Sequence, residues 1–161
     1  MNTTELLIHF TAPLLMLGCG LIGGVFFAFS SFVMKALVRL APAEGIAAMQ
    51  SINVVVLNPW FLGVFLGTAV ACALVMILSL LQWQPASSAW LVAGAVLYLV
   101  GTLVVTMLAN VPRNEVLAVL DPNAAGSVKL WAQYVSQWTF WNHVRTAASL
   151  AASLAFCFAL A

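Results

Sequence analysis

The stretch WAQYVSQWTFWNHVR, residues 131–145, decides the fold, and it leads directly into the apolar segment 146–161. Neither glycine nor proline occurs after residue 126, so one continuous helix is predicted from Ser127 onward. Helical spacings of seven, four and three residues place four of its side chains on one face: Trp131, Trp138, Asn142 and Arg145. Such a helix is about 50 Å long and exceeds the roughly 30 Å core of a bilayer, so we expect it to project from a membrane.

The composition around this stretch is that of a membrane protein. The chain has 161 residues, of which 65% are hydrophobic and 6% are charged. A soluble domain carries about 25% charged residues, so this chain lacks the polar side chains needed to cover a water-exposed surface. The net charge is +1 and no basic run occurs, which argues against nucleic-acid binding. We therefore expect an integral membrane protein whose main partner is the lipid bilayer.

Four apolar segments predict four spans within a single domain, 1–161. The spans are expected at about 6–34, 59–81, 89–109 and 142–161. Asn58 and Pro59 form a helix-start signal for the second span, and Pro112 marks the end or a kink of the third. The predicted fold class is all-α, an up-down transmembrane four-helix bundle with short cytoplasmic helical segments between the spans.

The distribution of basic residues predicts the orientation of the bundle. With four spans, all the basic residues fall at one end: Lys35, Arg39, Arg113, Lys129 and Arg145. The loop 82–88 at the other end has none. Because cytoplasmic loops carry the excess of Lys and Arg, we expect this basic end to be cytoplasmic and both termini to lie outside. The expected location is a bacterial inner membrane.

Rows of small residues occur in the first two spans. Gly20, Gly24 and Ala28 form one row, and Gly63, Gly67 and Ala71 form the other. Small residues four positions apart allow two membrane helices to approach closely. The rows are compatible with packing inside one chain or with a homo-oligomer.

Most of the polar side chains that enter or leave the spans gather at the predicted cytoplasmic end. This set comprises Asn53, Asn110, Asn114, Trp138, Asn142, His143 and Arg145. Buried amides need hydrogen-bond partners, because an unpaired one costs a few kcal/mol. The side chains either bond to one another and brace the helices, or surround a ligand.

Four motifs in this order carry a resemblance to a known family. They are AFS at 28–30 followed by Met34, MQSIN at 49–53, NVPRN at 110–114 and WTFWNHVR at 138–145. Together they resemble the anthrone oxygenase-like membrane proteins over nearly the whole chain, with a departure at Arg113, where the family pattern is apolar. The resemblance implies an oxidoreductase that converts anthrones to anthraquinones without metal or flavin, so we expect no cofactor and a hydrophobic aromatic small molecule as ligand.

That chemistry assigns a role to each side chain of the polar end. Arg145 would stabilise an oxyanion, Asn142 would donate a hydrogen bond to it, and His143 would be the base because its ordinary pKa is close to neutral. These three are the candidate catalytic residues. The candidate substrate-binding residues are Trp131, Trp138, Trp141, Asn53, Asn110 and Asn114.

Other interpretations of the same residues stay open. Tryptophans at a membrane interface commonly anchor a protein, Arg145 could bind lipid phosphate, and the asparagines could simply join helices. A non-enzymatic membrane protein that binds lipid or a partner protein, and a small transporter, are the alternative functions. An enzyme predicts a cavity lined by Trp138 and Arg145, a binding module predicts a filled bundle, and a transporter predicts a polar path across the membrane. No cluster of Cys, His or Glu has metal-ligand spacing.

Overall fold

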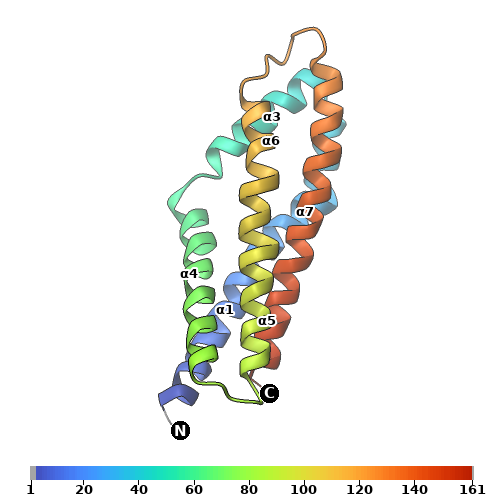
Figure 1. Cartoon of the computed structure of the whole chain (residues 1–161). Helices are drawn as coiled ribbons and strands as arrows, with labels where there is room; N and C mark the ends of the chain where they lie inside the picture. Colours follow the sequence, from blue (N-terminus) through green and yellow to red (C-terminus); the bar gives the residue numbers. More distant parts are fainter. Residues whose placement is uncertain (1–2, 161) are drawn as a thin grey trace.

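The computed structural model describes residues 3–160, with side chains from Phe10 onward, and the described residues form helices and no strand. Figure 1 shows elongated helices that run between two ends of the molecule. The termini end holds both chain ends and the loop 82–87, and the α3 end holds a short helix, α3 (Pro42–Val55). The all-helical prediction is confirmed.

Three continuous helical rods are long and apolar enough to cross a membrane: Phe10–Val38, Pro59–Leu81 and Ser88–Ala118. The first rod consists of α1 (Thr3–Ala28), η1 (Phe29–Val33) and α2 (Met34–Val38). The second is α4 (Pro59–Leu81). The third consists of α5 (Ser88–Tyr98), η2 (Leu99–Val104), η3 (Thr106–Asn110) and α6 (Val111–Ala118).

The start of α4 follows the sequence signal. The Asn58 side chain accepts hydrogen bonds from the backbone N–H groups of Trp60 at 3.1 Å and Phe61 at 3.0 Å. These bonds satisfy two of the donors that a helix leaves open in its first turn. Pro59 needs no donor at this position, so α4 begins where the Asn58-Pro59 pair predicts.

The third rod continues past Pro112 to Ala118, so the proline does not end the helix, while the membrane span expected at 89–109 stays a prediction. The segments η2 and η3 are π-helical, and the N–H of Val111 bonds to the carbonyl of Thr106, five residues earlier. Beside the proline, Arg113 Nη1 donates to the carbonyl oxygen of Ala109 at 2.6 Å. Proline has no backbone N–H to donate, and the π-helical hydrogen bonds and this side-chain bond allow the helix to continue in spite of the lost bond.

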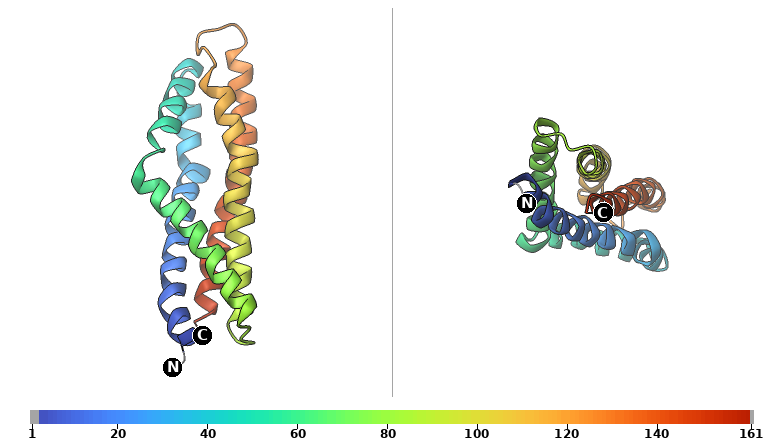
Figure 2. Two further views of the ribbon diagram at one scale, coloured as in Figure 1. Left: turned by 60° about the vertical axis from the view of Figure 1, so that its left-hand side comes forward. Right: turned by 90° about the horizontal axis from the view of Figure 1, so that it is seen from below.

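The last helix, α7 (Ser127–Phe158), is continuous for 32 residues, as predicted, or roughly 48 Å. It is less apolar than the three rods because Asn142, His143 and Arg145 lie in its middle. It lies alongside α1 and α5 in Figures 1 and 2, and Ser153 Oγ donates to the carbonyl of Met16 at 2.9 Å. The predicted bundle of four transmembrane helices depends on α7 and stays a prediction.

Close helix contacts form elsewhere than at the expected rows of small residues. Gly24, Gly63 and Gly67 have open space where a Cβ atom would be. Tight contacts occur at Gly18, next to Thr68 of α4, and at Gly23, Gly94 and Gly101, next to Leu150, Phe156 and Ala148 of α7. Three of these four contacts involve α7, so this polar helix is closely packed against both the first and the third rod.

A separate core forms at the α3 end. Ile46 and Met49 of α3 are fully buried there, and they belong to one hydrophobic cluster with Leu117, Trp131 and Trp138. Gln50 ties α3 to the end of α6 through bonds from Nε2 to the carbonyls of Leu117 at 2.8 Å and Leu120 at 2.9 Å. This core fixes α3 across the ends of α6 and α7.

Candidate functional site

A cavity of about 510 Å³ opens at the α3 end, between the first rod, α3, α4, the third rod and α7. Most of its lining is apolar, and we call it the α3-end cavity. Its polar lining residues are Gln50, Asn53, Thr106, Asn114, Glu115 and Arg145. Its volume and apolar wall suit a small organic molecule, with a few polar groups to orient it.

Arg145 places a buried cation in the wall of this cavity. The residue is 4% exposed. Its Nη2 donates to Asn142 Oδ1 at 2.7 Å and its Nη1 donates to Thr106 Oγ1 at 3.2 Å, while its Nε has no hydrogen-bond partner. Both bonds go to neutral groups, and no carboxylate among the described side chains pairs with the guanidinium. An unpaired charge costs several kcal/mol to bury, so an anion bound in the cavity would have a favourable electrostatic partner in this guanidinium.

Aromatic rings surround the guanidinium. Its central carbon lies 4.1 Å from the centroid of the Phe26 ring and 5.2 Å from that of Trp138. The Phe29 ring is 5.6 Å from Trp138, and all three rings line the cavity. Cation–π contacts offset part of the cost of burying Arg145, and the same rings provide flat surfaces for an aromatic ligand.

Asn142 positions Arg145 and does not line the cavity. Its Nδ2 donates to the carbonyl of Phe26 at 2.7 Å and to Ser30 Oγ at 2.8 Å, while its Oδ1 accepts from Arg145. Because a carbonyl only accepts and a guanidinium only donates, these bonds fix the orientation of the amide. Protein groups therefore engage both ends of the amide, and the predicted hydrogen bond from Asn142 to an oxyanion stays a prediction.

Every π-helical segment supplies hydrogen-bond partners to α7. From η1, Ser30 bonds to Asn142; from η2, Thr102 Oγ1 lies 2.8 Å from Ser149 Oγ. From η3, Thr106 bonds to Arg145 and Asn110 bonds to the backbone of Trp138. Such turns shift the register of a helix and occur frequently at functional sites. Here they direct the polar side chains of two rods toward one side of α7.

Asn114 holds Trp138 and Tyr134 at the edge of the cavity. Its Oδ1 accepts from Trp138 Nε1 at 2.8 Å and from the Tyr134 hydroxyl at 3.0 Å. An indole N–H only donates, so the amide must present its oxygen to these rings and turn its NH₂ group away from them. Burial raises the pKa of the Tyr134 phenol, which keeps the hydroxyl protonated as a donor.

Of the nine predicted site residues, Asn53, Asn114, Trp138 and Arg145 line the cavity. Asn110 is buried beside it and Asn142 lies behind Arg145. Asn110 Nδ2 donates to the carbonyl of Trp138 at 3.2 Å, and its Oδ1 has no partner. The two asparagines therefore support the wall, which was the alternative interpretation of these residues.

The remaining three predicted residues lie away from the cavity. Trp131 is buried, stacks on Tyr134 at 5.6 Å and packs on Gly45 of α3. Trp141 is half-buried against Phe140, at 5.3 Å between centroids. His143 is exposed. One residue along a helix turns the His143 side chain by about 100° from Asn142, and its role as the base stays a prediction.

Sequence reasoning missed Phe26, Thr106 and Glu115 as lining residues. Phe26 lies in an apolar run that carries no local signal. Thr106 and Glu115 belong to the third rod, where the π-helical segments change which residues share a face. The position of Glu115 could have been found by extending that helix through Pro112.

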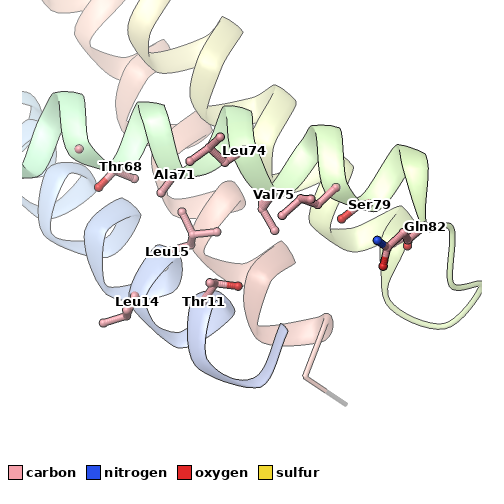
Figure 3. Close-up of a pocket in the computed structure, with 12 residues that line it drawn as sticks. Thr11, Leu14, Leu15, Thr68, Ala71, Leu74, Val75, Ser79 and Gln82 are labelled. Carbon is pink, nitrogen blue, oxygen red and sulfur yellow. The ribbon is translucent and has the colours of Figure 1, made fainter. Parts of the chain in front are cut away.

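A second cavity, of about 450 Å³, lies between α1 and α4 at the termini end (Figure 3). We call it the termini-end cavity. Leu15, Ala71 and Val75 contribute to its apolar lining, and its polar groups are hydroxyls and the amide of Gln82. No charged side chain is among its lining residues in the described part of the chain. It offers space and neutral hydrogen-bonding groups, but no charged partner for an ion.

Comparison with known proteins gives one match. The model of a family described as anthrone oxygenase matches residues 60–155, which is more than half of the chain. The match includes the third rod and the part of α7 that carries Trp138, Asn142 and Arg145. No curated protein and no solved structure matches the chain.

Proposed function

The chain belongs to the anthrone oxygenase family, and from that premise we propose that it is a membrane oxygenase without a cofactor. Its substrate would be an apolar aromatic ketone of the anthrone type, bound in the α3-end cavity. The observation that carries the proposal is the buried guanidinium of Arg145, which has no carboxylate partner and faces an apolar, aromatic-lined cavity. An aromatic molecule with an ionised oxygen would supply the negative charge that can pair with this guanidinium.

The reaction needs little from the protein. An anthrone carries a methylene group opposite its ketone, and loss of one methylene proton gives an anion whose charge lies largely on the ketone oxygen. This electron-rich anion reacts with O₂ at the former methylene carbon to give a hydroperoxide. Loss of water then leaves the quinone, so that one ketone and one O₂ yield one quinone and one H₂O.

Arg145 would act by stabilising the anion. A positioned cation in a low-dielectric site lowers the free energy of a developing oxyanion more than the same charge does in water. Phe26, Phe29 and Trp138 would bind the ring system, and Asn114, held by Trp138 and Tyr134, would offer its NH₂ group. The cavity would also hold the substrate out of water, which strengthens the attraction between the anion and the guanidinium.

The proposal includes a fourth transmembrane helix, formed by about residues 142–161 of α7. Lipid would then surround the bundle while α3, α6 and the first turns of α7 project from it. Lys35 lies in α2, Arg39 directly after it, Arg113 in α6 and Lys129 in the first turn of α7, and all three helices contact α3. By the positive-inside rule the α3 end would face the cytoplasm of a bacterium, with both termini outside the inner membrane.

The test uses the full chain purified in detergent micelles with anthrone as the probe. Oxygen consumption and quinone absorbance are followed, and the rate in empty micelles is subtracted. Wild type should exceed the spontaneous rate, and Arg145→Met should abolish the excess, while Arg145→Lys should retain part of it because the charge remains. Equal rates for wild type and Arg145→Met would rule out the proposed role of the guanidinium.

A further inference from the structure

The α3-end cavity contains a group that can accept the substrate's proton. Six polar residues line it, and five of them are unsuited to the task. Threonine, asparagine and glutamine side chains do not take up a proton near neutral pH, and an arginine is already protonated. Glu115 is the remaining one, and a carboxylate is a common general base in proteins.

The position of Glu115 on α6 is set by the helix. Val111, Asn114, Glu115 and Ala118 all line the cavity, and their spacing of three, four and seven residues defines one face. The opposite side of α6, with Arg113 and Val116, lines a different and smaller cavity. Asn114 anchors this face through its bonds to Trp138 and Tyr134. Glu115 is the next residue, so these bonds also hold the backbone that carries its carboxylate.

Glu115 and Arg145 differ in depth. Arg145 is almost fully buried, whereas Glu115 is exposed to solvent while still lining the cavity. A substrate that binds with its ketone oxygen at Arg145 would direct its methylene carbon toward the rim. Glu115 would then lie close to the methylene proton and could pass it on to water at the rim.

We propose that Glu115 is the general base that removes the methylene proton, an inference that rests on the proposed function. The C–H bond breaks, and its electron pair passes into the ring system and onto the ketone oxygen beside Arg145. The proton forms an O–H bond with the Glu115 carboxylate and is released to water at the rim. A carboxylate is a weak base for a carbon acid, so the transfer depends on Arg145 stabilising the anion that forms.

The experiment compares Glu115→Gln with wild type across a range of pH, using anthrone in detergent micelles. Glu115→Gln keeps the size of the side chain and removes its basicity. Glu44→Gln is the matched control, because Glu44 lies at the start of α3, accepts from the N–H of Ala41 at 3.3 Å and does not line the cavity. Quenching of tryptophan fluorescence by the ligand reports binding separately from turnover.

We expect Glu115→Gln to lower turnover at pH 7 by about 100-fold or more, with unchanged ligand binding. The deficit should shrink as the pH rises to where anthrone ionises without help. Glu115→Ala should be equally slow and should be partly restored by added acetate, since the position is open to solvent. A purely structural role would produce neither the pH dependence nor the rescue.

Two outcomes would overturn the assignment. Turnover of Glu115→Gln within twofold of wild type at every pH would show that another group or water takes the proton. A loss that is equal at every pH, accompanied by lost binding and no rescue by acetate, would show that Glu115 only shapes the cavity. Either result leaves the proposed function standing if Arg145→Met is inactive, whereas a wild type no faster than empty micelles overturns both.

Discussion

The two large cavities have similar volumes but different chemistry. The α3-end cavity measures about 510 Å³ and the termini-end cavity about 450 Å³, and both are bounded by the first rod and α4. The first contains Arg145 and Glu115, and the second has no charged side chain in its described lining. In a chain with 6% charged residues, a cation in the lining of one apolar cavity and absent from the described lining of the other is the difference on which the proposed site rests.

The difference arises from α7 and the π-helical turns that face it. At the α3 end, Ser30, Thr106 and Asn110 turn toward α7 and bond to its polar residues. At the termini end, fully buried Phe156 and Ala152 of α7 pack in an ordinary hydrophobic core. The same helix therefore carries the polar network of the candidate site in its middle and a packed hydrophobic core at its end.

The largest expected effect is on turnover, and it separates the two cavities. Arg145→Met should lower anthrone oxidation by at least about 100-fold, as removal of an oxyanion donor does in other enzymes. Ser79→Ala, in the lining of the termini-end cavity, should leave turnover within about twofold. Comparable losses in both variants would remove the distinction between the cavities.

Arg145→Met also has an expected effect on stability that is unusual for a buried polar residue. Removing an unpaired buried cation relieves its desolvation cost, which balances the two hydrogen bonds that are lost. The free energy of unfolding in detergent should therefore change by less than about 2 kcal/mol. A larger destabilisation, measured by denaturant titration, would indicate that the guanidinium is a structural brace.

Replacing Asn142, unlike replacing Arg145, should clearly lower the free energy of unfolding, because Asn142 is a neutral side chain whose hydrogen bonds are lost without relief of a buried charge. Asn142→Leu removes two bonds to the first rod, at Phe26 and Ser30, and one to Arg145 within α7; if each contributes the roughly 0.6 kcal/mol of an average bond between membrane helices, the loss should be about 2 kcal/mol. Ser153→Ala is the control, because its one bond to Met16 joins the same two helices, and it should cost about 0.6 kcal/mol. Equal losses of unfolding free energy in the two variants would mean that the three bonds of Asn142 stabilise the protein no more than the single bond of Ser153.

Trp138 should affect ligand binding more than any tryptophan at the termini end. Trp138→Leu removes a ring that lines the cavity and contacts Arg145, so the Kd for an aromatic ligand should rise about tenfold, as expected for a lost stacking contact of roughly 1.4 kcal/mol. Trp90 packs on Phe158 at 5.0 Å at the other end, and Trp90→Leu should leave the Kd unchanged. Equal increases would place the ligand elsewhere.

The smallest expected effect belongs to His143. Its side chain is exposed and does not line the cavity, so His143→Ala should leave turnover and its pH dependence unchanged within about twofold. A loss of more than tenfold, with the stability of the variant unaltered, would restore His143 as the base and argue against Glu115.

Much of the site could be predicted from the sequence because one helix carries its centre. The spacing from Trp138 to Asn142 and Arg145 requires only a regular helix, and α7 is regular throughout. The rest depends on tertiary structure. The π-helical turns that direct Thr106 and Asn110 toward α7 have no local sequence signal, and neither does the approach of Phe26 from a distant rod.

The errors have physical causes of the same kind. Pro112 was expected to end or kink a helix, yet π-helical register and the Arg113 side chain carry the helix onward and bring Glu115 to the cavity. The start of the last helix is not among these errors, because the helix predicted from Ser127 onward begins there, with Gly126 at a φ of 95° before it. The proposed role of His143 as a base stays a prediction, and its side chain is exposed and does not line the α3-end cavity.

The most direct measurement of the central claim is the ionisation of a coloured ligand in the α3-end cavity. A hydroxyanthraquinone changes colour when its hydroxyl loses a proton, so its pKa can be read from absorbance when it is bound to the protein or dissolved in empty micelles. If Arg145 is an unpaired cation awaiting an oxyanion, binding to wild type lowers the pKa of the ligand, and Arg145→Met abolishes the decrease. A bound ligand with the pKa it has in micelles, or a decrease that persists in Arg145→Met, would contradict the account.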